Sequence, residues 1–238
     1  RGRIVGQDWI SHVTVEDGRI TAVDPAAEEP ADLGGDDSVI GPLLFDVQVN
    51  GAGGINLQGP NVTPEDVRAL ADLLVKWGVG QFIPTLITAS FDDMAHGCRV
   101  IAEAMTDPVV LRSVRGIHLE GPYISSVDGP RGAHPRDHVR EPDLDEFKRL
   151  LDAADGWVKY VTVAPEVERA REFIQDVANR GIVVALGHHN GTPDDIAAAV
   201  DAGASLCTHL GNGLASTIHR HHNPLWPQLA EDRLGCSL

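Results

Sequence analysis

The sequence predicts an α/β protein, an incomplete (β/α)8 TIM-type barrel that follows part of a small β domain. From residue 39 onward, short apolar segments alternate with amphipathic segments of helical length, which is typical of a parallel sheet covered by helices. Residues 1–40 instead carry β-rich runs on both sides of Glu16-Asp17-Gly18, which is a hairpin signal. No GxGxxG motif follows the first barrel strand, so a dinucleotide-binding sheet is disfavoured.

Seven apolar segments are expected to form the parallel strands, with helices between them. The expected strands are residues 43–49, 80–87, 114–119, 158–163, 182–187, 205–208 and 234–238. The first helix is expected to begin at Thr63-Pro64, an N-cap followed by proline, and the others to span residues 92–105, 144–154, 167–180 and 194–202. We therefore expect a partial β domain over 1–40 and a barrel domain over 41–238 that lacks its last strand or strands.

Composition and charge exclude several classes of partner. The chain has 238 residues and a formal charge of −16, so neither nucleic acid nor an anionic membrane is expected as a partner. No apolar run approaches the roughly 18 residues that a membrane span needs. The three cysteines are far apart and show no CxxC spacing, which indicates a reducing compartment and a cytoplasmic protein. The chain opens without methionine and stops within an apolar run, so we expect a fragment.

Ligand-type side chains stand where three of the expected strands end. Glu120 precedes a Gly-Pro break, His188 and His189 follow the strand at 182–187, and His209 follows the strand at 205–208. The carboxyl ends of barrel strands meet at one face, so these side chains are expected to lie together. One carboxylate and two imidazoles suit Zn²⁺ or another divalent first-row ion. The alternative is that they are ordinary strand-end residues that hold loops by hydrogen bonds.

Two loops and one buried histidine are further candidates. Residues 212–224 combine Arg220 with three histidines and Gly213, and an arginine with free backbone N–H groups suits a phosphate. A solvated loop or a subunit contact is the alternative for this segment. The loop at 129–135 is rich in glycine and proline and would allow His134 to lie over a pocket. His118 is expected to face inward, either as a satisfied core histidine or as a partner that orients a metal ligand.

Seven short motifs occur in order along the chain. They are FDVQVNG at 45–51, PTLIT at 84–88, HLEGPY at 118–123, GAHP at 132–135, VAPE at 163–166, GHHNGT at 187–192 and THLGN at 208–212. Together they resemble the N-acetylglucosamine-6-phosphate deacetylases of the amidohydrolase superfamily over nearly the whole chain. The resemblance implies a (β/α)8 barrel with a small β-sandwich made from both chain ends. It also implies metal-dependent removal of the acetyl group from N-acetylglucosamine 6-phosphate, giving glucosamine 6-phosphate and acetate.

The resemblance also implies a set of metal ligands. Glu120, His188 and His209 would hold one divalent ion, with zinc expected and iron, cobalt or manganese as alternatives. Many superfamily members carry His-x-His for a second metal where this chain has Gln48 and Asn50, so a single ion is implied. The family has His-Ser-Asn where His189 stands here, so His189 competes with His188 as a ligand. We prefer the residue directly after Gly187.

Substrate contacts and the general base are implied in the same way. His134 would contact the substrate, Asn212 and Gly213 would bind its phosphate, and Arg220 would reach the phosphate in the neighbouring subunit of a homodimer. The general-base aspartate of the family has no match in this chain and is expected beyond Leu238. Two alternatives stay open: an amidohydrolase for another N-acetyl hexosamine or a cyclic amide, and an inactive fragment that binds ligand or metal without the aspartate.

Overall fold

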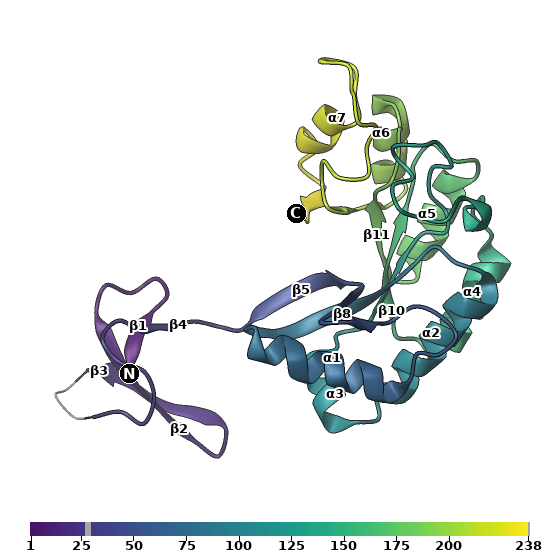
Figure 1. Ribbon diagram of the computed structural model, residues 1–238. Helices are drawn as coiled ribbons and strands as arrows, with labels where there is room; N and C mark the ends of the chain where they lie inside the picture. The colour runs from purple at the N-terminus through teal and green to yellow at the C-terminus, as the bar shows by residue number, and fades with distance from the viewer. Residues whose placement is uncertain (27–29, 238) are drawn as a thin grey trace. The chain divides into compact units, whose positions relative to one another are not determined.

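A computed structural model describes residues 1–26 and 30–237, and the chain divides into two compact units (Figure 1). The first unit is Arg1–Leu44 and the second is Phe45–Leu238. Leu238, with which the expected strand at 234–238 ends, lies outside the described residues. The assignment of the first unit to a β-sandwich shared by both chain ends stays a prediction.

The first unit is a four-stranded sheet in the order β3-β2-β1-β4. Its strands are β1 (Gly2–Ile4), β2 (Ile10–Glu16), β3 (Arg19–Pro25) and β4 (Val39–Ile40). β2 and β3 pair antiparallel around Asp17 and Gly18, whose φ angles of 50° and 74° are those of a tight hairpin turn. The predicted hairpin is therefore confirmed.

The second unit is built on a curled parallel sheet of seven strands in the order β13-β12-β11-β10-β9-β8-β5 (Figure 1). The strands are β5 (Leu44–Val49), β8 (Val79–Ile87), β9 (Ile117–Glu120), β10 (Val158–Val163), β11 (Val183–Leu186), β12 (Leu206–Cys207) and β13 (Gly235–Cys236). Each strand lies beside the next one along the chain, which is the arrangement of successive β/α units. The predicted incomplete (β/α)8 barrel is confirmed.

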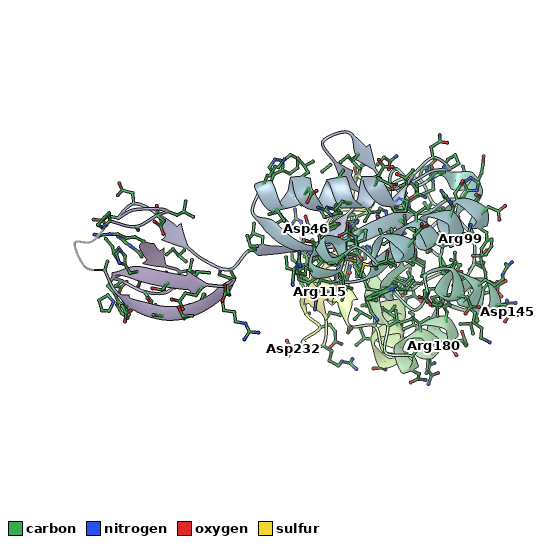
Figure 2. All side chains as sticks on the ribbon, turned by 90° about the horizontal axis from the view of Figure 1, so that it is seen from below. Asp46, Arg99, Arg115, Asp145, Arg180 and Asp232 are labelled. Carbon is green, nitrogen blue, oxygen red and sulfur yellow. The ribbon has the colours of Figure 1, made fainter. Side chains whose placement is uncertain are left out.

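Helices connect the strands and cover the outer face of the sheet (Figure 1). They are α1 (Pro64–Lys76), α2 (Phe91–Ala104), α3 (Pro108–Ser113), α4 (Leu144–Ala153), α5 (Ala170–Asn179), α6 (Pro193–Asp201), α7 (Leu225–Leu229) and the 3-10 turn η1 (Arg136–His138). Charged side chains such as Arg99, Asp145 and Arg180 lie on the solvent side of this layer (Figure 2). None of the helices in the described residues has the length and apolar character needed to cross a bilayer.

Two helices begin with the same capping device. Thr63 accepts a hydrogen bond from the Asp66 N–H, and the Asp66 carboxylate accepts one from the Thr63 N–H at 2.9 Å. Thr192 and Asp195 repeat this arrangement at the start of α6. Each box satisfies backbone donors that the first helical turn leaves unpaired. The second box fixes the end of the loop that carries His188.

A small hairpin and one glutamine lie between β5 and α1. The hairpin consists of β6 (Gly51–Ala52) and β7 (Ile55–Asn56). Beyond it, the side-chain amide of Gln58 pairs with the backbone N–H and C=O of one residue of β8. The Ile87 N–H donates to Gln58 Oε1 at 2.9 Å, and Gln58 Nε2 donates to the Ile87 carbonyl at 3.1 Å. A side chain thereby makes the two hydrogen bonds that a neighbouring strand would make, and it ties the hairpin segment to the carboxyl end of β8.

Gly121 allows the break after Glu120, because its φ is +83° and a Cβ at this position would overlap Thr88 Oγ1. We expect Gly121→Ala to lower the free energy of unfolding by about 2 kcal/mol or more, from backbone strain plus displacement of Thr88. Denaturant unfolding measures this loss. Gly156→Ala is the matched control, since its φ is +75° and no atom lies within 4 Å of its Cβ position. Equal losses in the two variants would contradict a role for the contact with Thr88.

Candidate metal centre

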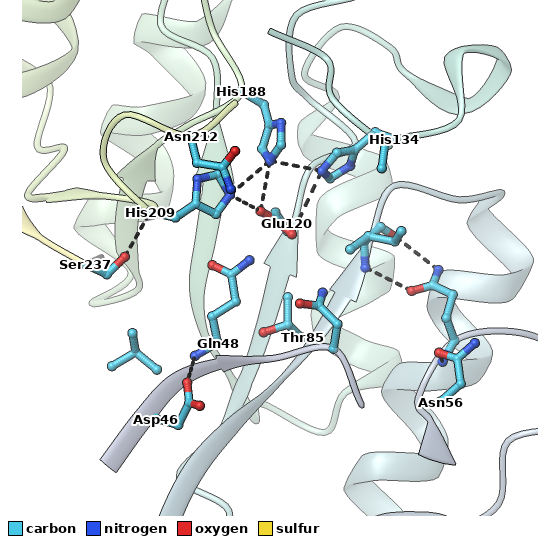
Figure 3. Close-up of a pocket in the computed structure, with 15 residues that line it drawn as sticks. Asp46, Gln48, Asn56, Thr85, Glu120, His134, His188, His209, Asn212 and Ser237 are labelled. Carbon is cyan, nitrogen blue, oxygen red and sulfur yellow. Dashed lines mark hydrogen bonds and ion pairs between the residues drawn. The ribbon is translucent and has the colours of Figure 1, made fainter. Parts of the chain in front are cut away.

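The carboxyl ends of β9, β11 and β12 bring one carboxylate and two imidazoles together (Figure 3). Glu120 is the last residue of β9, whereas His188 and His209 follow the ends of β11 and β12. Both histidines have left-handed backbone angles, with φ of +51° and +30°. Such angles are uncommon for residues other than glycine and cluster at functional sites. The structure thus brings the three sequence-predicted ligands to one place.

The donor atoms of these three side chains are spaced as ligands of one ion would be. Glu120 Oε1 lies 3.1 Å from His188 Nε2 and 2.9 Å from His209 Nε2, and the two Nε2 atoms are 3.1 Å apart. Two ligands at about 2.0–2.1 Å from the same first-row ion lie about 2.9–3.4 Å apart for bond angles between octahedral and tetrahedral. The observed spacing therefore fits a metal ion.

A hydrogen bond on the far side of the His188 ring fixes which of its nitrogens faces the centre. His188 Nδ1 lies 3.0 Å from the Pro130 carbonyl, which can only accept, so Nδ1 carries the proton and Nε2 offers a lone pair. That lone pair points at Glu120 Oε1 and His209 Nε2. Convergence of acceptors on one point is unfavourable unless a positive charge lies between them. A metal-bound histidine typically donates its other N–H to a carbonyl in this way.

His134, predicted to contact the substrate, lies in the same cluster. Its Nδ1 is 2.8 Å from Thr88 Oγ1, and its Nε2 is 3.2 Å from His188 Nε2 and 3.9 Å from Glu120 Oε2. Glu120, His134 and His188 are all buried and form a group that could hold a metal ion. His134 is thus a further donor next to the three predicted ligands.

His189, the competing ligand in the sequence, belongs to a different set of contacts. Its Nδ1 accepts a hydrogen bond from the Gly191 N–H at 3.2 Å, and its ring also hydrogen-bonds Gln228 of α7. Burial lowers the pKa of His189 to about 4, so the ring is neutral at neutral pH. His189 therefore ties the loop after β11 to α7, and His188 is the member of the pair that faces Glu120.

The pKa shifts of Glu120 and His134 favour the protonation states that suit a metal ion. Burial alone would raise the pKa of Glu120, but the adjoining imidazoles of His188 and His209 outweigh it and hold this pKa well below its usual range. Burial lowers the pKa of His134 to about 4. Burial lowers the pKa of His209, but its contact with the Glu120 carboxylate outweighs this effect and raises that pKa. An ionised carboxylate and neutral imidazoles are the forms that bind metals, so metal binding would displace any proton that His209 holds.

The cluster opens into a cavity of about 690 Å³. Its polar lining comes mainly from β5, the hairpin segment and the loops after the strands, and includes Asp46, Gln48, Asn50, Asn56, Gln58 and Ser237. Gln48 extends from β5 into this space (Figure 3). Its Oε1 is buried and has no hydrogen-bond partner among the described residues. A polar cavity of this size suits a small hydrophilic ligand.

Of the residues predicted to contact the phosphate, Asn212 and Gly213 lie at the centre, whereas Arg220 lies away from it. Asn212 lines the cavity, and Gly213 packs against the His188 ring, where a Cβ would come within 3.0 Å of Nδ1. Arg220 stands in the exposed loop between β12 and α7, outside the residues that line the cavity in the described part of the chain. Its carbonyl accepts hydrogen bonds from Trp226 Nε1 at 2.8 Å and Asn223 Nδ2 at 3.3 Å, which fix the backbone of this loop.

Some residues that shape the centre were not anticipated from the sequence. Thr88 and Pro130 orient the rings of His134 and His188, and Gln58 holds one wall of the cavity. Thr88 had a usable signal, because it is a polar residue directly after an apolar strand. The roles of Pro130 and Gln58 depend on the paths of two loops and left no pattern in the sequence.

Comparisons with known proteins agree with this geometry. N-acetylglucosamine-6-phosphate deacetylase from Bos taurus is 34% identical over 197 residues, which cover 82% of this chain and 47% of the relative. N-acetylgalactosamine-6-phosphate deacetylase from Escherichia coli O157:H7 is 28% identical over 235 residues, which cover 98% of this chain and 61% of the relative. No protein-family model matches the chain.

The solved structures point the same way. A mutant of N-acetyl-D-glucosamine-6-phosphate deacetylase from Mycobacterium smegmatis, in complex with N-acetyl-D-glucosamine-6-phosphate, superposes with a TM-score of 0.79 at 31% identity. The match covers 95% of this chain and 58% of that one. The chain therefore spans about half the length of the relatives it matches.

Proposed function

The chain belongs to the N-acetylglucosamine-6-phosphate deacetylase family, and from this we propose that the protein removes the acetyl group from N-acetylglucosamine 6-phosphate. The products are glucosamine 6-phosphate and acetate. The observation that carries the proposal is the convergence of Glu120, His188 and His209 at the ends of three strands, within a polar cavity. This reaction yields a phosphorylated amino sugar and is a step in amino sugar breakdown.

The proposed metal ligands are Glu120, His188 and His209, which hold one divalent ion. Zinc is the expected ion, with iron, cobalt or manganese as alternatives, because two imidazoles and a carboxylate suit all four. When bound, such an ion lowers the pKa of a water molecule and polarises an acyl carbonyl. His134 is held by Thr88 through Nδ1 and turns Nε2 towards the cluster, so we assign it a hydrogen bond to the substrate.

Proton transfer is assigned to a residue outside the described cluster. The reaction needs a base that takes a proton from water and delivers it to the leaving amine. Asp46 lines the cavity and accepts a hydrogen bond from the Gln48 N–H at 3.0 Å, but its place in the sequence does not match the aspartate of the family. We propose that the base is the aspartate of the family, in sequence beyond Leu238.

The phosphate of the substrate is proposed to bind at Asn212 and Gly213, with Arg220 supplied by the second subunit of a homodimer. The exposed position of Arg220 outside the cavity lining supports a role across a subunit boundary. A guanidinium group offers a phosphate two parallel N–H donors. The strongly acidic chain and its free cysteines support a cytoplasmic enzyme without nucleic acid or membrane partners.

Acetate release tests the proposal directly. We expect metal-loaded full-length protein to release acetate from N-acetylglucosamine 6-phosphate, and chelation to lower the rate about a hundredfold or more because the water loses its activating ion. Added Zn²⁺ restores the rate after chelation. No acetate from this substrate or from related N-acetyl hexosamine phosphates would rule the proposal out.

The epimeric substrate is the second candidate, because the relative from Escherichia coli O157:H7 is an N-acetylgalactosamine-6-phosphate deacetylase. The two 6-phosphates differ only in the configuration at C4. Comparing kcat/KM for both, and for the two unphosphorylated sugars, separates the candidates. A preference for an unphosphorylated sugar or a cyclic amide would argue against the roles of Asn212 and Arg220.

A further inference from the structure

His118 is buried inside the barrel, two residues before Glu120 on β9, and the two side chains therefore share one face of the strand. Its Nδ1 lies 3.1 Å from Thr85 Oγ1 on β8, and its Nε2 lies 2.8 Å from Thr162 Oγ1 on β10. The Tyr160 ring stacks on the imidazole, with centroids 3.5 Å apart and planes at 7°. One side chain thus links the strands on both sides of β9.

The contacts continue across the sheet to the residue before His209. Thr162 Oγ1 lies 2.7 Å from Thr208 Oγ1, although β11 runs between the strands that carry these residues. Gly187, directly after β11, makes this contact possible. A Cβ there would lie 2.8 Å from both Thr162 Cγ2 and Thr208 Cβ. The absence of a side chain at Gly187 lets the two hydroxyl groups meet.

The proton positions in this row of hydrogen bonds follow from the Ile83 carbonyl, which can only accept a hydrogen bond. Thr85 Oγ1 donates to the Ile83 carbonyl at 3.3 Å, so it accepts from His118 Nδ1–H. His118 Nε2 then accepts from Thr162, and Thr162 accepts from Thr208. Each donor in this row has one acceptor, and the row runs in a single direction from the β12 end to β8.

We propose that His118 is a positioning residue, which holds Glu120 and His209 at ligand spacing through the row Thr85–His118–Thr162–Thr208. The inference rests on the proposed metal-dependent function. Apolar side chains would fill the same space without the cost of desolvating an imidazole and three hydroxyl groups. Fully satisfied buried networks fix side-chain and strand positions more tightly than apolar contacts do. Partners that orient metal ligands commonly change metal affinity by about 10–100-fold.

The test compares Thr162→Ser with Thr162→Ala in the full-length protein. Both variants lose the methyl group, and only serine keeps the hydroxyl group that joins His118 to Thr208. We expect the serine variant to bind Co²⁺ within about twofold of the wild type, and the alanine variant to bind it about tenfold more weakly with an altered visible spectrum. Chelator competition measures the affinity.

Val161→Ala is the control, because Val161 is its neighbour on β10, is buried, and packs in the apolar core. It should lower thermal stability and leave the Co²⁺ affinity and spectrum unchanged. If Thr162→Ala does not fold, Thr85→Ser and Thr85→Ala repeat the comparison from the β8 side. Equal affinities and spectra for the serine and alanine variants would overturn the positioning role. Failure of the wild type to bind Co²⁺ or Zn²⁺ would instead overturn the proposed function itself.

Discussion

Glu120→Gln is expected to remove the bound metal and the activity together. Glutamine keeps the shape of the side chain but lacks the negative charge that offsets a divalent ion between His188 and His209. We expect the metal content of the full-length protein to fall from about one ion per chain to less than about a tenth, and acetate release to fall about a thousandfold or more. Elemental analysis of purified protein and an acetate assay measure the two effects.

Glu166→Gln is the matched control for this change. Glu166 follows β10 much as Glu120 ends β9, and its Oε1 accepts a hydrogen bond from the Asn190 N–H at 2.6 Å. Burial raises the pKa of Glu166, so its carboxyl group tolerates a neutral form better than Glu120 does. The control should keep its metal. A full metal content in Glu120→Gln, or equal losses in both variants, would contradict the assignment of Glu120 as a ligand.

Arg220→Met is expected to damage phosphosugar hydrolysis and leave metal binding intact. Methionine keeps much of the side-chain length and removes the guanidinium group that would face the phosphate. We expect kcat/KM for the 6-phosphate to fall about a hundredfold, with little change for the unphosphorylated sugar. Initial-rate kinetics on both substrates measure the ratio. Equal losses on both substrates would show that the residue does not act on the phosphate.

Mixed dimers test whether Arg220 acts across the subunit boundary. Co-expression of Arg220→Met with Glu120→Gln gives hybrids in which one site combines an intact Glu120 with an intact Arg220 from the other subunit. Random assembly at equal amounts would restore activity in about one quarter of all sites. An arginine that served its own subunit would leave every hybrid site damaged. Recovery near one quarter therefore supports the crossed arrangement, and no recovery contradicts it.

The barrel strands could be predicted because their ends carry local signals. The strand at Val158–Val163 has the predicted bounds, since Gly156 precedes it and Pro165 follows it closely. The strand predicted at 114–119 begins later, at Ile117, because Val114 makes only an isolated bridge with Phe82. Short elements such as α3, α7 and the β6–β7 hairpin were missed, because a few residues show no periodic pattern.

The candidate centre could be predicted only in part. Strand order alone brought Glu120, His188 and His209 together, because parallel strands end at one face. The choice between His188 and His189 depended on backbone angles and on Gln228 in a helix that was not predicted. The place of His134 beside the cluster depended on a loop path that no local pattern encodes.

The pairing of Gln58 with Ile87 makes the local stability of the cavity wall measurable by amide exchange. The Ile87 amide proton is bonded to a side chain and not to a neighbouring strand. Its exchange with deuterium therefore requires the glutamine to swing away, which is a local event with a lower free energy than global unfolding. Amide exchange at Ile87, compared with that of core strand residues, would report the free energy needed to separate Gln58 from β8. The exchange rate of this one amide proton therefore reports how readily the cavity wall opens.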